Sequence, residues 1–122
     1  MTNMLIPGIL ALLGTIIGGT FADIDLAPPL PLRHRSAWTH GPLIPLIIAV
    51  LVNQHVYVWW VAVGFLPAYA YHLLADMAPK KWRGAAKISL FPLPGRLPAL
   101  LSFLYLAAGV GTSLYVLTSI IE

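Results

Sequence analysis

Six side chains that can ligate metals or transfer protons fall in three stretches of the sequence: Asp23, Asp25, His34, His40, His72 and Asp76. The last two have the i, i+4 spacing that places side chains on one face of a helix. Carboxylates and neutral imidazoles together are the ligand set for zinc, manganese or iron. Three segments that lie far apart in the sequence therefore predict a site for a divalent metal.

Four apolar runs must position these side chains, and they cover approximately residues 4–22, 38–54, 56–78 and 97–121. A bilayer core is crossed by about 20 helical residues. The second run reaches that length only if it extends from Trp38 to Gln54, so whether it crosses fully is left open. Of the 122 residues, 59% are hydrophobic and 9% are charged, whereas a soluble domain carries about 25% charged residues. We therefore expect a single all-α membrane domain over residues 1–122, a bundle of about four transmembrane helices.

The basic residues indicate the orientation of that bundle. All seven Lys and Arg side chains lie in two segments, 23–41 and 79–96. If four spans alternate, these two loops share one face, which the positive-inside rule makes cytoplasmic. The sequence thus predicts a multi-pass protein of the inner (plasma) membrane, surrounded by membrane lipids, with its polar cluster at the cytoplasmic face.

Three smaller features can be compared directly with a structure. Gly14 and Gly18 form a small-xxx-small face that predicts close contact between helices. Tyr69 and Tyr71 are interpreted as interfacial aromatic residues near one end of the third run. His55 falls at the face opposite the polar cluster and is interpreted as an interfacial residue.

Composition also excludes some chemistry. The chain has no cysteine, which rules out disulfides, thiolate metal sites and cysteine nucleophiles. The formal net charge of +3 comes from a few residues in loops, which membrane topology explains better than nucleic-acid binding. Nucleic acid is therefore not an expected partner.

A local interpretation competes with the metal site. Asp23 and Asp25 would cap a helix end beside Arg33 and Arg35, and His34 and His40 would be interfacial side chains. The pair His72 and Asp76 is harder to explain in this way, because ionisable residues in or at the edge of a span are costly and usually mark a site. Six ligands would suit one ion with carboxylates that orient the ligands, or two ions a few ångströms apart.

The ordered motifs resemble those of a known family. They are Gly19-x3-Asp23-Ile24-Asp25, His34-Arg35-Ser36-x2-Thr39-His40-Gly41 and His72-x3-Asp76. This order is similar to that of the predicted membrane-bound metal-dependent hydrolases, which include LexA-binding inner-membrane proteins. The chain departs from the family where Phe21-Ala22 replaces the usual proline before the first Asp, and where five rather than four residues separate His34 from His40. The resemblance implies a metal site and, with it, a hydrolase.

Two functions follow from these observations. The first is hydrolysis of an ester or phosphoester by one or two divalent ions, most simply zinc or manganese, at the cytoplasmic membrane surface. Asp23, Asp25, His40, His72 and Asp76 would be ligands, with Asp25 able to serve as the general base, His34 as a ligand or proton carrier, and Arg35 as the partner of a carboxylate or substrate phosphate. The alternative is a non-catalytic small subunit or assembly factor of a larger membrane protein complex, in which the polar cluster is a structural latch.

Overall fold

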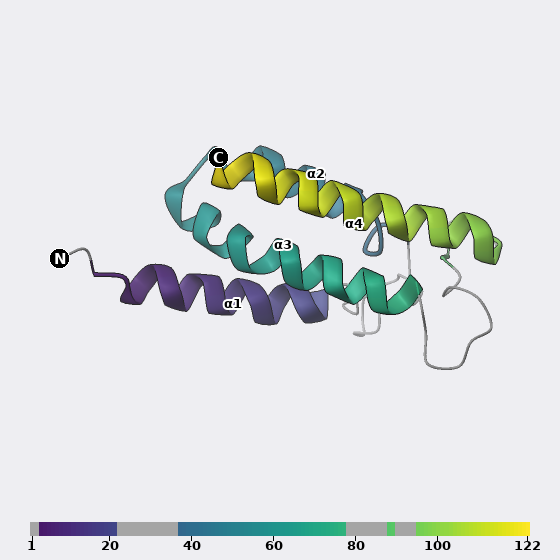
Figure 1. The fold of residues 1–122 in the computed structure, drawn as a ribbon, viewed down its shortest axis with the longest axis horizontal. Coiled ribbons are helices and arrows are strands. Elements are labelled where there is room, and N and C mark those ends of the chain that lie inside the picture. The colour runs from purple at the N-terminus through teal and green to yellow at the C-terminus, as the bar shows by residue number, and fades with distance from the viewer. Residues whose placement is uncertain (1–2, 22–36, 78–87, 90–94) are drawn as a thin grey trace.

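The computed structural model describes residues 3–21, 37–77, 88–89 and 95–122. These residues contain four helices: α1 (Leu5–Phe21), α2 (Leu43–Leu51), α3 (Val56–Met77) and α4 (Ala99–Ile121). Each helix coincides with one of the four apolar runs, and prolines stand before α2 and α4 at Pro42 and Pro98. The described part of the chain is thus an elongated helical bundle (Figure 1).

Glycine residues bring α1 and α3 into direct backbone contact. Gly14 and Gly18 are buried, and a Cβ atom on either would overlap the carbonyl oxygen of Val61 or Phe65 in α3. Gly64 meets the backbone of α1 in the same way. The offset between Gly14 and Val61 equals that between Gly18 and Phe65, so the two helices run parallel. The predicted small-residue contact face is confirmed, with α3 as its partner.

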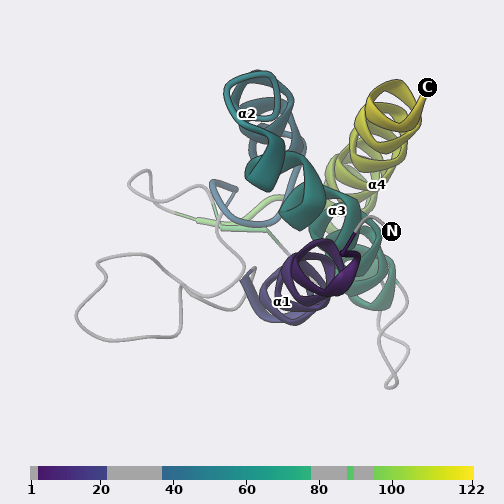
Figure 2. The ribbon, with the colours of Figure 1, turned by 90° about the vertical axis from the view of Figure 1, so that its left-hand side faces the viewer.

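The other two helices run antiparallel to α3. The indole Nε1 of Trp59 donates a hydrogen bond to the carbonyl oxygen of Ile120, at 2.8 Å, whereas Leu73 lies against Gly109. The start of α3 is therefore beside the end of α4. Viewed along the bundle, α3 lies between α1 on one side and α2 and α4 on the other (Figure 2).

Only two of the four helices have the dimensions of a membrane span. At 1.5 Å per residue, the 22 residues of α3 and 23 of α4 extend about 33 and 35 Å, against a hydrocarbon core of about 30 Å. Their length and apolar composition suggest membrane association. Large apolar side chains also cover the outside of the bundle; Leu12, Val50 and Leu100 are 61%, 65% and 70% exposed.

The expected count of four transmembrane helices is not supported. Helix α1 has 17 residues, and α2 has only nine, which extend about 13 Å. Residues 38–42, which were needed to lengthen the second run into a span, form turns rather than helix. The described residues form a bundle of four helices, two of which are long enough to cross a membrane.

The described residues of the two loops expected on one face, 37–41 and 88–89 with 95–96, meet at one end of the bundle. The backbone N–H of Ala37 donates to the carbonyl oxygen of Ser89 at 2.9 Å, and Ser89 pairs with Arg96 in an isolated β-bridge. The C-terminal ends of α1 and α3 lie at this end as well (Figure 1). His55 lies at the opposite end, immediately before α3, as the sequence predicts.

Candidate metal centre

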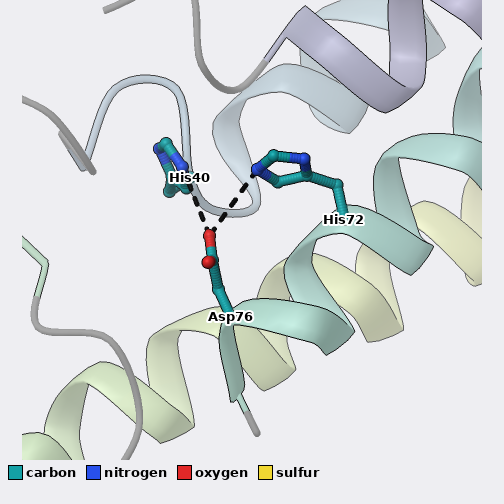
Figure 3. A group of neighbouring side chains, drawn as sticks. All are labelled: His40, His72 and Asp76. Carbon is teal, nitrogen blue, oxygen red and sulfur yellow. Dashed lines mark ion pairs between the residues drawn. The ribbon is translucent and has the colours of Figure 1, made fainter. Parts of the chain in front are cut away.

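Three side chains that could ligate a metal ion converge where the turn before α2 meets the last turns of α3. His40 comes from the turn, and His72 and Asp76 come from α3 one helical turn apart (Figure 3). The Nε2 atom of His40 is 3.4 Å from the Oδ2 atom of Asp76, and the Nε2 atom of His72 is 3.6 Å from the same oxygen. One ligand atom from each residue lies within 4.8 Å of the others. The arrangement is that of a compact three-ligand cluster.

The backbone of α1 orients one of the two imidazoles. The Nδ1 atom of His72 lies 3.0 Å from the carbonyl oxygen of Gly19. Because a carbonyl oxygen only accepts, this contact places the proton of a neutral His72 on Nδ1 and leaves the lone pair on Nε2. Ligating histidines usually donate their second nitrogen to a carbonyl or carboxylate in this way. Helix α1 therefore both packs on α3 and sets the tautomer of His72.

The second imidazole is held through the backbone around it. The Nδ1 atom of His40 is 2.9 Å from Oγ1 of Thr39, which directs its Nε2 atom towards Asp76. The buried hydroxyl of Tyr69 donates to the carbonyl oxygen of Thr39 at 2.6 Å and accepts from the N–H of Gly41 at 3.2 Å. One side chain of α3 thus binds the backbone on both sides of His40.

A second tyrosine and close packing complete the support of this turn. The hydroxyl of Tyr105 in α4 donates to the carbonyl oxygen of Ala37 at 2.6 Å. A Cβ atom on Gly41 would overlap the ring of Tyr105, and one on Gly109 would approach the Gly41 backbone to 3.0 Å. The turn that carries His40 is therefore held by both long helices.

The interpretation of Tyr69 as an interfacial aromatic is wrong. Its side chain is fully buried, whereas that of Tyr71 is 75% exposed, as expected of a lipid-facing or interfacial residue. Tyr69 precedes His72 by three residues and Asp76 by seven, so all three share one face of α3. That spacing is the sequence signal that could have connected Tyr69 with the site.

The donor set fits a divalent ion. Zinc binds imidazole nitrogen and carboxylate oxygen at about 2.0–2.2 Å, so ligand atoms of a tetrahedral site stand about 3.3–3.6 Å apart. The two distances to Asp76, 3.4 and 3.6 Å, match this spacing, and the three atoms together lie within 4.8 Å of one another. The His40 side chain is fully buried, and those of His72 and Asp76 are 16% and 15% exposed. The side chains of His72 and Asp76 are therefore partly accessible to a small molecule such as water.

The structure brings together three of the predicted site residues and leaves the others untested. Asp23, Asp25, His34 and Arg35 lie outside the described residues. His55, at the other end of the bundle, is exposed, accepts a hydrogen bond from the N–H of Tyr57 at 3.3 Å and stacks on its ring. The sequence did not predict a part in the site for Tyr69 or Tyr105, and it places Gly19 in the first motif without indicating its role as a carbonyl partner of His72.

Comparison of the chain with protein-family models, with curated proteins and with solved structures finds no match. The class that the fold defines is therefore a helical bundle with candidate membrane spans. A function for this chain is therefore inferred from the positions of His40, His72 and Asp76.

Proposed function

We propose that this chain is a membrane-embedded metal-binding protein that hydrolyses an ester or phosphoester at the membrane surface. The single observation that supports it most is the convergence of His40, His72 and Asp76 within 4.8 Å in a bundle whose described core is mostly apolar. Groups of this kind are costly beside a membrane and mark functional sites by default. Each imidazole also has its Nδ1 atom occupied by a neighbouring oxygen, which is how ligating histidines are oriented.

The roles of the side chains follow from their chemistry. His40, His72 and Asp76 would hold the ion, and Asp23 and Asp25 would supply further ligands, with Asp25 also able to take the proton of the attacking water. A divalent ion, zinc or manganese, supplies the Lewis acidity that activates water near neutral pH. Arg35 would bind a phosphate or carboxylate oxygen of the substrate. His34 would carry a proton between site and solvent.

Removal of the metal tests the hydrolase activity. Protein purified in detergent is assayed with a panel of carboxylic and phosphoric esters before chelation, after chelation and after zinc or manganese is added back. We expect turnover of at least one class, its loss after chelation and its recovery with metal. Turnover that survives complete chelation, or no turnover by the metal-loaded protein on any member of the panel, contradicts the proposal.

One observation favours the alternative of a non-catalytic subunit. Asp76 lies within 4 Å of both histidines and so joins the turn before α2 to the end of α3. Such a contact can act as a structural latch without any metal. The two functions differ in what the cluster contributes to stability, because breaking a buried charged pair costs about 3–5 kcal/mol.

The proposal includes an orientation, with segments 23–41 and 79–96 in the cytoplasm and both termini outside. It is supported by the location of all seven basic residues in those segments. The chain has no native cysteine, so single-cysteine variants Ser36→Cys and Thr2→Cys can be labelled without background. In intact cells an impermeant maleimide should label Thr2→Cys, and Ser36→Cys only after permeabilisation. Labelling of Ser36→Cys from outside would reverse the orientation.

A further inference from the structure

An apolar groove runs between α1 and α2, with α3 as its floor. Its volume is about 300 Å³ and every residue that lines it is apolar, among them Ile17, Phe21, Ile44, Ile47, Val58 and Phe65. Helix α1 makes its main helix contacts with α3. The end-on view shows α1 and α2 on different sides of α3 (Figure 2). The groove therefore opens sideways, towards the surroundings of the bundle.

The groove is aligned with the metal centre. Val58, Phe65 and His72 follow one another at seven-residue intervals in α3, so they share one face of the helix at steps of about 10 Å. Phe21 lies two residues after Gly19, whose carbonyl oxygen orients His72. Ile44 lies four residues after His40. The groove thus lies on the same face of α3 as His72, about two helical turns from it, and extends along the bundle axis towards the opposite end.

We propose that this groove binds one acyl chain of a membrane lipid, with the ester or phosphoester of that lipid at the metal centre. The inference rests on the proposed function and names its substrate class. The lining offers no hydrogen-bonding group, which suits a hydrocarbon chain and no polar ligand. His72 and Asp76 lie in the last turns of α3, at one end of the bundle, and the residues of α3 that line the groove, Val58 to Phe65, lie farther from that end. A lipid in a bilayer has its polar and apolar parts in the same order, with its esters at the interface and its acyl chains directed inward.

Photocrosslinking tests this binding without depending on turnover. The protein is placed in phosphatidylcholine–phosphatidylglycerol vesicles that contain a small fraction of phosphatidylcholine with a diazirine in one acyl chain. Ile47→Trp fills the groove, and Leu46→Trp is the matched control, because both positions are exposed on α2 at 45% and 52% and only Ile47 lines the groove. We expect crosslinks concentrated on groove residues, reduced about tenfold, or 1.4 kcal/mol, by Ile47→Trp and unchanged by Leu46→Trp.

Two outcomes would overturn the inference. One is crosslinking spread evenly over exposed apolar positions such as Leu46 and Leu100, which is lipid surrounding the bundle only. The other is groove labelling that Ile47→Trp leaves intact. Metal content is measured on the same samples, so the two proposals fail separately. A labelled groove in a protein that takes up no metal removes the hydrolase, whereas a metal-loaded protein with an unlabelled groove removes the acyl-chain site.

Discussion

His72→Ala and Asp76→Ala are each expected to abolish metal binding and turnover while the helices remain folded. Each substitution removes one of the three candidate ligand atoms that lie within 4.8 Å of one another, and the loss of one of these three weakens the binding of a divalent ion. Active-site residues are seldom those that stabilise the scaffold. We therefore expect a change below about 1 kcal/mol in the free energy of unfolding of metal-free protein, against about 3–5 kcal/mol for a buried latch. Metal content, turnover and thermal unfolding in chelator measure the three quantities together.

Tyr69→Phe provides a graded comparison for these variants. It keeps all three ligands and removes the hydroxyl that binds the backbone on both sides of His40. Loss of a residue that orients a ligand typically lowers metal affinity or activity by about 10–100-fold. Tyr71→Phe is the control, since Tyr71 is 75% exposed.

The opposite result for the first two variants would contradict a metal site. If His72→Ala and Asp76→Ala unfold the metal-free bundle while wild-type protein binds no metal, the cluster is a structural latch.

Gly14→Ala is expected to separate α1 from α3 and to destabilise the bundle. A Cβ atom at this position would overlap the carbonyl oxygen of Val61, which belongs to the backbone of α3 and cannot rotate away. Overpacking of this kind costs about 1–3 kcal/mol and sometimes more. Because Gly19 at the end of α1 orients His72, a displaced α1 should also weaken metal binding. Thermal unfolding and metal content of the purified variant measure both effects.

Gly8→Ala is the matched control for this prediction. Gly8 lies in the same helix and a Cβ atom there has nothing within 4 Å. Alanine is favoured over glycine inside a helix by about 1 kcal/mol, so this variant should be as stable as the wild type or more so. Equal stability of Gly14→Ala and Gly8→Ala would contradict the close packing of α1 on α3.

Local spacing in the sequence predicts the elements that depend on one helix face. The i, i+4 relation of His72 and Asp76 and the small-residue spacing of Gly14 and Gly18 both reappear in the structure. The apolar runs likewise predict four helices in the right places. Each of these features follows from the periodicity of a helix in an apolar environment.

The remaining features depend on contacts between segments far apart in the chain. Tyr69 binds the backbone 28 to 30 residues away, and a tyrosine near the end of an apolar run is equally typical of a membrane interface. Helix α2 is short because residues before Leu43 form turns that Tyr69 and Tyr105 hold. Both sets of contacts join segments that are far apart in the chain, so no regular spacing of residues along a single sequence predicts them.

The metal content of the purified wild-type protein is the most direct test of metal binding by His40, His72 and Asp76. The protein is prepared without a polyhistidine tag, incubated with zinc or manganese, freed of unbound ion and analysed by mass spectrometry of the elements, beside His72→Ala treated in the same way. We expect at least one divalent ion per wild-type chain and almost none in His72→Ala. Wild-type protein that stays free of metal, or a His72→Ala variant that binds as much metal as the wild type, would contradict it.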